Sequence, residues 1–184
     1  MPDPDLTDEQ LLAAHREGDG RAFGELVRRH GDRLWSVAVR VLGRPDEAAE
    51  AVQEALLAAH RGVAAFRGDA AVRTWLQRIV VNTCRDRLRR ARARPVLVQW
   101  PRSDLPAAQP DTATVLVTRL AVHDALAELP VEQRVAVVLV DVQGCAVAEA
   151  AEILEVPVGT VKSRCARGRA RLAVLLGHLR EETP

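Results

Sequence analysis

The sequence PVGTVKSRCARGRARL, residues 157–172, predicts an amphipathic helix with a strongly basic face. It carries five cations and no acid, and no acid occurs anywhere in residues 156–180. Val161, Cys165 and Leu172 fall at helical spacing, so we expect them to face inward. A solvated helix usually mixes charges of both signs, because opposite charges four residues apart attract each other. The segment therefore favours contact with nucleic-acid phosphates over plain solvation.

The segment before it, CAVAEAAEILEV at residues 145–156, predicts a shorter apolar helix. Two short helices joined across LEVPVG resemble a helix-turn-helix. Ala151 is small, which suits the close approach of the two helices, and Pro157 and Gly159 open the second helix. In such a motif the second helix enters the major groove, where arginines reach phosphates or guanine edges. Gly168 inside this helix is expected to cost about 1 kcal/mol relative to alanine.

The composition of the whole chain favours an all-α protein. It has 184 residues, 48% hydrophobic, with a net charge of +1 and no tyrosine. Helix-forming residues are abundant, whereas aromatic strand formers are scarce. The N-terminus lacks the pattern of a secretory signal and the longest apolar run, 135–140, is too short to span a bilayer, so we expect a cytoplasmic protein. Three cysteines, at 84, 145 and 165, have no metal-ligand spacing and are read as buried hydrophobes, which predicts neither a metal site nor a disulfide.

A proline-rich stretch divides the chain into two helical blocks. Residues 95–114 contain four prolines and predict an extended linker, in which Trp100 could dock. In the N-terminal block the pattern predicts helices over 6–18, 19–43, 44–62 and 73–94, with a loop at 65–72. Thr7 is the expected cap of the first helix and Gly43 the expected end of the second. In the C-terminal block it predicts helices over 115–129 and 131–142 before the helix-turn-helix.

Two helices of the N-terminal block have opposite charge. The helix over 73–94 carries an arginine row with Asn82 and Trp75, which suits a nucleic-acid surface, although Trp75 taken alone reads as a core residue. The helix over 44–62 has an acidic side, which could be solvated or could meet a basic partner protein. Charge alone leaves these two interpretations of the acidic side open.

Five segments in this order resemble the extracytoplasmic-function (ECF) sigma factors of bacterial RNA polymerase, and within them the SigM-type group of actinobacteria. The segments are GDGRAFGELVRRH, PDEAAEAVQEALL, FRGDAAVRTWLQRIVVNTCRDRLRR, LPVEQRVAVVLVDVQG and VPVGTVKSRCARGRARL. The resemblance implies two small helical domains, a sigma-2 bundle at 1–94 and a sigma-4 helix-turn-helix at 115–184. The linker at 95–114 would thread toward the polymerase active-site channel.

The resemblance also implies partners for each charged surface. The acidic helix would bind core RNA polymerase at the basic β′ clamp helices, with further contact to the β subunit, and promoter DNA would be read at two elements. We expect the free chain to bind promoters weakly, an anti-sigma factor to control it, and no cofactor. Three sets of residues carry these roles: Asp46, Glu47, Glu50, Gln53 and Glu54 for core polymerase; Phe66, Arg67, Arg73, Trp75, Arg78, Asn82 and Arg85 for the minus-10 element; Thr160, Lys162, Ser163, Arg164 and Arg167 for the minus-35 element.

Three positions depart from the family pattern. Ala49 lacks the carboxylate of the usual D-A-E-D motif, which predicts fewer core contacts. Ala146 stands where a hydroxyl usually caps the helix, at an expected cost of about 1 kcal/mol. Glu155 replaces the usual turn glycine, and a left-handed conformation there would cost about 1–2 kcal/mol. Together with Gly168, these positions predict a C-terminal domain of modest stability.

Two other functions account for parts of the sequence less well. A DNA-binding regulator of the LuxR-like output class explains the C-terminal block equally well, but it leaves the acidic helix and the arginine-rich helix unexplained. An enzyme is disfavoured because there is no glycine-rich phosphate loop and the acids follow helical faces instead of converging on a pocket. The five histidines are scattered as well, at positions 15, 30, 60, 123 and 178.

Overall fold

The computed structural model describes residues 6–93 and 110–177, and within them the chain is all-α, as predicted. The described residues form eight α-helices, one 3-10 turn at Val63–Ala65 and one π-helical turn at Val138–Val142, and they contain no strand. The predicted linker up to residue 109, Trp100 and Arg94 lie outside the described residues. The helices are α1 Asp8–Arg16, α2 Gly20–Leu42, α3 Pro45–Gly62, α4 Val72–Ala93, α5 Pro110–Ala127, α6 Val131–Val137, α7 Val147–Leu154 and α8 Val158–Leu175.

Local signals set the boundaries of the first three helices. Thr7 caps α1 in a capping box with Gln10, which satisfies two backbone N–H groups that the helix leaves unpaired. Gly43 ends α2 in a left-handed conformation, with φ 80°, which glycine adopts without steric cost. Pro45 then opens α3 at a position where its missing N–H is not needed. These ends agree with the sequence prediction.

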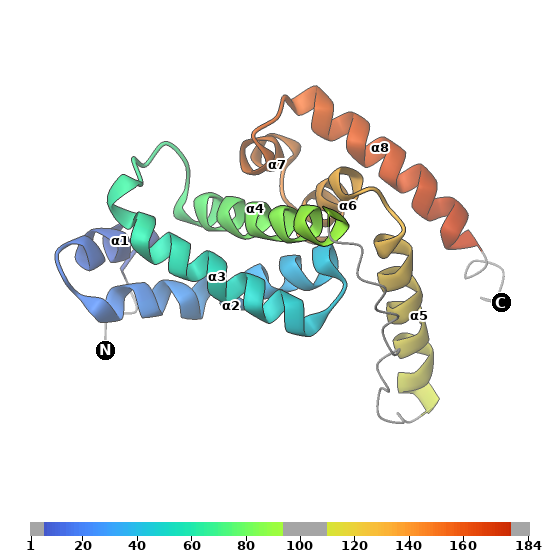
Figure 1. The fold of residues 1–184 in the computed structure, drawn as a ribbon, viewed down its shortest axis with the longest axis horizontal. Helices are drawn as coiled ribbons and strands as arrows, with labels where there is room; N and C mark the ends of the chain where they lie inside the picture. Colours follow the sequence, from blue (N-terminus) through green and yellow to red (C-terminus); the bar gives the residue numbers. More distant parts are fainter. Residues whose placement is uncertain (1–5, 94–109, 178–184) are drawn as a thin grey trace.

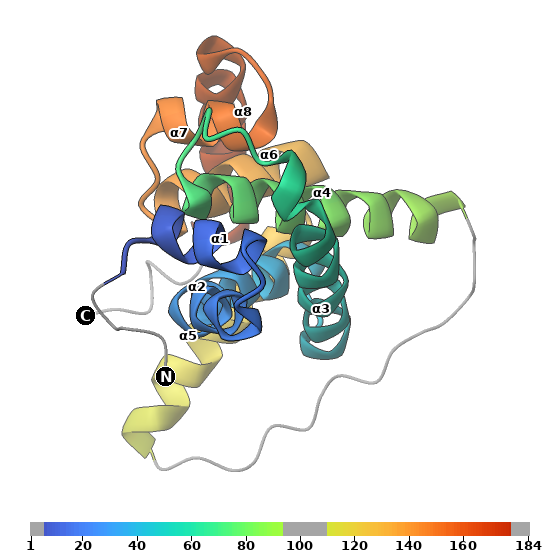
Figure 2. The ribbon, with the colours of Figure 1, turned by 90° about the vertical axis from the view of Figure 1, so that its left-hand side faces the viewer.

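Helix α4 is the central element of the molecule. Figures 1 and 2 show α1, α2 and α3 on one side of α4, and α6, α7 and α8 on the other. On the first side, small buried alanines of α3, such as Ala48 and Ala55, let this helix approach α2 and α4 closely. Buried Leu34 and Val41 of α2 belong to the same hydrophobic core. The buried side chains of both sides form one continuous cluster, so the C-terminal helices pack onto the N-terminal bundle.

Two C-terminal elements differ from the sequence prediction. Helix α5 begins at Pro110, inside the predicted linker, since proline is well tolerated in the first turn of a helix. The predicted helix over 131–142 changes at Val138 into a π-helical turn, where the N–H of Gln143 bonds to the carbonyl of Val138 at 2.9 Å. The wider turn brings Gln143 to α2, where its side-chain amide donates to Ser36 Oγ at 3.0 Å.

Arginines join the two halves by binding backbone carbonyls. Arg134 of α6 is only 6% exposed. Its guanidinium donates to the carbonyl of Val41 at 2.6 Å, near the negative C-terminal end of α2, and to carbonyls at the end of α5 and just after it. Arg33 of α2 donates to the carbonyl of Gln143 at 2.5 Å. These polar contacts add to the continuous hydrophobic core that joins the halves.

The helix-turn-helix shows the expected irregularities, with one addition. Ala146 stands at the N-cap of α7 without a side-chain hydrogen bond, and Glu155 adopts the left-handed region with φ 54°, as expected. Gly168 has a packing role that the sequence expectation did not include. A Cβ at this position would lie 2.7 Å from Val137 Cγ2 of α6, so glycine is what allows α8 to pack against α6. Its low helix propensity is offset by that packing.

Candidate protein and nucleic-acid interfaces

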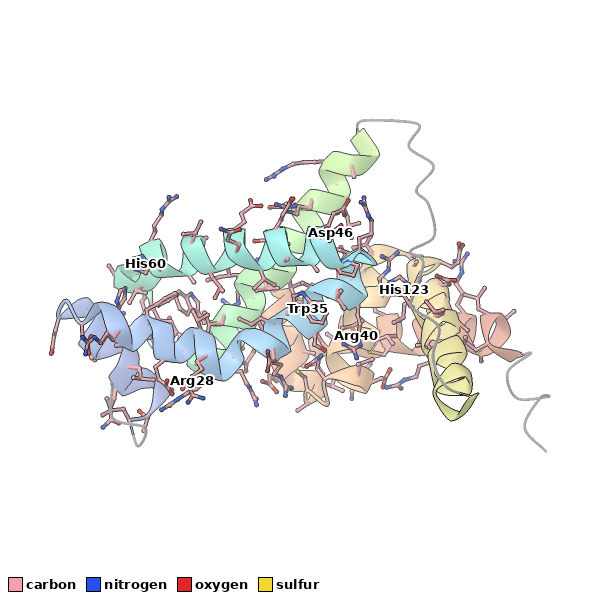
Figure 3. All side chains as sticks on the ribbon, turned by 90° about the horizontal axis from the view of Figure 1, so that it is seen from below. Arg28, Trp35, Arg40, Asp46, His60 and His123 are labelled. Carbon is pink, nitrogen blue, oxygen red and sulfur yellow. The ribbon has the colours of Figure 1, made fainter. Side chains whose placement is uncertain are left out.

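The acidic side of α3 faces away from the C-terminal helices. Asp46 and Gln53 are exposed on it, and Figure 3 shows Asp46 at the beginning of α3. Glu47 pairs with Arg44 at 2.5 Å. Glu50 and Glu54 both pair with one cation of α4, the guanidinium of Arg87, at 3.0 and 3.1 Å. The five predicted core-polymerase residues therefore lie on one helix, three of them held by nearby arginines.

An apolar groove of about 500 Å³ lies between α2 and α3 beside these acids. Trp35 and Leu57 are unusually exposed for large hydrophobic residues, at 44% and 51%, and Figure 3 shows Trp35 between the two helices. Ala49, which was expected to weaken a core contact, lines this groove. Sequence reasoning missed the groove; the available signal was that Trp35 lies off the buried stripe of α2. Its walls are Phe23, Trp35, Ala49, Val52, Gln53, Leu56, Leu57 and His60.

The predicted minus-10 loop is held against the bundle. Arg16 of α1 donates to the carbonyls of Val63 and Phe66, which fixes the chain at the start of the loop. The rings of Phe66 and Trp75 lie 5.1 Å apart, tilted by 50°. Trp75 is half-buried and packs against the core, in keeping with its reading as a core residue, whereas Arg67 is exposed. The structure thus brings these aromatic and basic residues together at one end of α4.

The predicted minus-10 arginines of α4 face acids of the C-terminal half. Arg73 pairs with Glu149 of α7 at 2.5 Å. Arg78 pairs with Glu155 in the turn after α7 at 3.4 Å. Arg85 pairs with Glu132 of α6 at 2.8 Å. Asn82, on the same helix, is half-buried.

The predicted minus-35 residues divide between two faces of α8. Lys162, Ser163 and Arg167 are exposed, and Arg167 donates to the carbonyl of Ser163 at 3.2 Å. The hydroxyl of Ser163 donates to the carbonyl of Thr160 at 3.0 Å. Arg164 instead turns inward, with 19% of its side chain exposed, and pairs with Glu132 at 3.0 Å. Glu132 thereby contacts one arginine from each predicted DNA surface.

The three cysteines are buried, as predicted. Burial raises the pKa of the Cys84 thiol to about 12, and it also raises the pKa of Cys145 and Cys165. Among residues 6–93 and 110–177 no group of three or more His, Cys, Asp and Glu side chains is placed to hold a metal ion. Within the same residues, no helix combines the length and the apolar character that crossing a membrane requires.

Family models and relatives match both halves of the chain. Sigma-70 region 2 matches residues 26–94 and Sigma-70 region 4 matches residues 119–172. The ECF RNA polymerase sigma factor SigM of Mycobacterium tuberculosis H37Rv is 53% identical over 94% of this chain and 86% of its own length. The ECF RNA polymerase sigma-E factor of Escherichia coli K12 is 33% identical over 89% of this chain and 91% of its own.

Two solved structures share the fold. A chain in the structure of CnrH in complex with the cytosolic domain of CnrY matches with a TM-score of 0.70 at 31% identity, over 93% of this chain and 97% of its own. A chain in the complex of the sigma factor RpoE with the anti-sigma factor NepR from Bartonella quintana matches with a TM-score of 0.65 at 24% identity, over 84% and 96%. The region 2 match also covers the acidic and arginine-rich helices, which a LuxR-like regulator leaves unexplained.

Proposed function

The chain belongs to the ECF sigma factors of bacterial RNA polymerase, and from that premise we propose which of its surfaces meets the core enzyme and which meet DNA. A sigma factor binds core polymerase and directs promoter recognition and transcription initiation, and it is not itself an enzyme. The observation that carries the assignment is the separation of charge: acids and an apolar groove lie on α3, whereas arginines lie on α4 and α8. Protein and DNA partners therefore approach different sides of the molecule.

The α3 face is the proposed core-polymerase site. The basic clamp helices of β′ would place cations against Asp46, Glu50 and Glu54. The opposite charges would attract the two proteins before contact and fix the register of the clamp helices on α3. Apolar residues of the same partner would enter the groove beside Trp35 and Leu57, where desolvated contacts contribute most of the affinity. Glu47 and Gln53 lie on the same helix and complete the site. The β subunit is proposed as a further partner within the core enzyme.

The loop after α3 and the face of α4 form the proposed minus-10 site. Phe66 and Arg67 lie at the loop, where a base flipped from the non-template strand would stack and its phosphates would meet a cation. Trp75 supports the loop from beneath through its contact with Phe66. The remaining members of the site lie along α4 and would follow the strand: Arg73, Arg78, Asn82 and Arg85.

The exposed face of α8 is the proposed minus-35 site. Lys162, Ser163 and Arg167 would reach base edges and phosphates in the major groove, with Thr160 near the N-terminus of the helix. Arg164 belongs to the same site, but it reaches DNA only after leaving Glu132. A linker at 95–114 between a sigma-2 domain at 1–94 and a sigma-4 domain at 115–184 makes the second DNA contact intramolecular, which strengthens binding by two weak sites.

An anti-sigma factor is the proposed controlling partner. One structural neighbour was solved with the anti-sigma factor NepR, and another, CnrH, with the cytosolic domain of CnrY. The exposed groove and acids of α3 offer such a partner the same surface that core polymerase uses. We place the protein in the cytoplasm, where its polymerase and DNA partners are.

Reversing charge on α3 tests the assignment. In Asp46→Lys/Glu50→Lys/Glu54→Lys we expect loss of co-elution with core RNA polymerase, because cations would then face the clamp helices. The matched control Glu9→Lys/Glu17→Lys/Glu128→Lys changes net charge equally at exposed acids elsewhere and should still assemble. Circular dichroism checks the helix content of both, and run-off transcription on a genomic promoter library checks promoter use. Assembly by the first variant as tight as by wild type would refute the site.

A further inference from the structure

The side chain of Arg16, at the end of α1, binds the backbone at the start of the proposed minus-10 loop. Its Nε and Nη2 both donate to the carbonyl of Val63, at 3.1 and 2.8 Å, and Nη2 also donates to the carbonyl of Phe66. These partners lie 47 and 50 residues further along the chain. Because the guanidinium is planar and rigid, these hydrogen bonds fix both the position and the direction of the chain between Val63 and Phe66. We call this contact the Arg16 brace.

A basic residue in the last turn of a helix usually has a local explanation, because it offsets the negative end of its own helix dipole. Arg16 instead reaches carbonyls that follow α3, where the 3-10 turn at Val63–Ala65 ends the helix. Carbonyls at the end of a helix carry negative partial charge, which repels DNA phosphates. The Arg16 brace therefore satisfies these carbonyls and places a cation beside the loop.

Aromatic rings hold the end of α1 in the position that the Arg16 brace requires. The ring of His15, the residue before Arg16, lies 4.6 Å from the ring of His60 in α3 and 5.3 Å from that of Phe23 in α2. Phe23 and His60 also meet edge to face, with 5.1 Å between their centroids, and Figure 3 shows His60 at this end of α3. Helices α1, α2 and α3 thus meet at three packed rings beside Arg16, so its guanidinium acts from a fixed base.

The proposed minus-10 loop is held where it begins and exposed in its middle. The ring of Phe66 packs against Trp75 of α4 at 5.1 Å, so α1 holds Phe66 through its carbonyl and α4 holds it through its ring. The next residues, Arg67, Gly68 and Asp69, are exposed. A loop that is already fixed at its base loses less conformational freedom when its exposed residues close on a ligand. The two contacts therefore prepare the loop for a base that leaves the DNA stack.

We propose that Arg16 is a positioning residue for minus-10 recognition: by bracing the loop, it sets how strongly the loop prefers one base over another. The inference rests on the proposed function of the loop at Phe66 and Arg67. It adds α1, which precedes the start of the region 2 match at residue 26, to the promoter-reading part of the chain. Discrimination between bases depends on well-aligned contacts to base edges, whereas attraction to phosphates does not. Loss of the Arg16 brace should therefore lower base preference more than strand affinity.

Run-off transcription by the holoenzyme measures base preference. The template is the promoter that wild type transcribes most strongly from a genomic library, with each base of its minus-10 and minus-35 elements replaced in turn. In Arg16→Gln we expect preference at the most selective minus-10 base to fall roughly 5-fold, while preference at minus-35 bases keeps its wild-type value. A variant that is only unstable lowers the output of every template equally and leaves these ratios unchanged. Wild-type minus-10 preference in Arg16→Gln would overturn the inference.

Two matched variants separate bracing from charge. Arg61→Gln removes a neighbouring exposed cation, in the last turn of α3, and it should keep wild-type preference. Arg16→Lys keeps the charge but replaces the planar guanidinium by a single ammonium, so its preference should fall between those of wild type and Arg16→Gln. Equal losses in Arg16→Gln and Arg61→Gln, or full preference in Arg16→Lys, would attribute the effect to charge and overturn the inference.

Hydrogen exchange of backbone amides, measured by mass spectrometry on the free chain, reports the loop directly. Exchange in a peptide covering 63–72 should be faster in Arg16→Gln than in wild type and unchanged in Arg61→Gln. Wild-type exchange in Arg16→Gln would contradict the Arg16 brace.

Phe66→Ala distinguishes this inference from the proposed function in the same transcription assay. We expect it to lower minus-10 preference, because the stacking ring is lost. Unaltered minus-10 preference in Phe66→Ala would refute the role of the loop. A loss in Phe66→Ala with none in Arg16→Gln would leave that role in place and refute the Arg16 brace alone.

Discussion

The outer face of α3 and the inner face of α4 are both charged, yet they differ in how their charges are satisfied. The acids of α3 find partners within their own half: Glu50 meets Arg87, 37 residues away. The arginines of α4 find partners in the other half: Arg73 meets Glu149, 76 residues away. The acids of α3 therefore keep their partners however the halves are arranged, whereas the arginines of α4 depend on the packing of the C-terminal helices. The difference predicts that a change at the contact between the halves affects the α4 face and leaves the α3 face intact.

Removing the buried cation between the halves should have the largest effect on this arrangement. Arg134→Ala leaves carbonyls of α2 and of the α5 end without their donor, so we expect the free energy of unfolding to fall by about 3 kcal/mol. Urea denaturation followed by circular dichroism measures it. Arg171→Ala, at an exposed position of α8, should change stability by less than about 0.5 kcal/mol. Similar losses in both variants would mean that the carbonyl contacts do not hold the halves.

Truncating the exposed tryptophan sharpens the comparison from the α3 side. Trp35→Ala should weaken binding to core polymerase by about 2 kcal/mol, or roughly 30-fold. The reason is that the variant loses an exposed aromatic side chain that the bound partner would bury. Binding titrations with labelled protein test this, with Val174→Ala as an exposed apolar control on α8. Wild-type affinity in Trp35→Ala would exclude the groove from the interface.

Filling the glycine of α8 examines the packing that positions the minus-35 face. In Gly168→Ala the new methyl group meets Val137 Cγ2 at 2.7 Å, so overpacking outweighs the gain in helix propensity and we expect a net loss of about 1 kcal/mol. Gly24→Ala is the matched change within α2, where no atom from another part of the structure lies within 4 Å of the added carbon, and it should stabilise instead. Thermal unfolding of the two variants should therefore shift Tm in opposite directions. A rise in both would show that α6 yields to the methyl group.

Relieving the strained turn should give the smallest change. Glu155→Gly removes the left-handed strain but also one partly exposed ion pair, so the two effects nearly cancel and we expect a net gain below about 1 kcal/mol. Glu155→Gln keeps the strain and loses the charge, and it should be slightly less stable than wild type. At low salt we expect the Tm of Glu155→Gly to be the highest, that of wild type intermediate and that of Glu155→Gln the lowest. A Tm of Glu155→Gly below that of Glu155→Gln would show that the turn is not strained.

Much of the fold follows from the sequence because its causes are local. Thr7, Gly43 and Pro45 set helix ends through groups a few residues away, and the predicted ends agree with the structure. The groove at Trp35 depends on how far apart α2 and α3 pack, and the cost assigned to Gly168 depends on Val137 of another helix. The sequence pattern assigns acids and arginines to faces of individual helices. It does not predict that they pair across the halves, because that pairing depends on how the helices pack together.

The double contact of Glu132 joins three helices through one side chain. One carboxylate oxygen pairs with Arg85 of α4 and the other with Arg164 of α8. Because Glu132 and Arg164 both lie on the C-terminal helices, parting from α4 would free Arg85 and leave Arg164 neutralised. The two proposed DNA surfaces therefore gain these cations in separate steps.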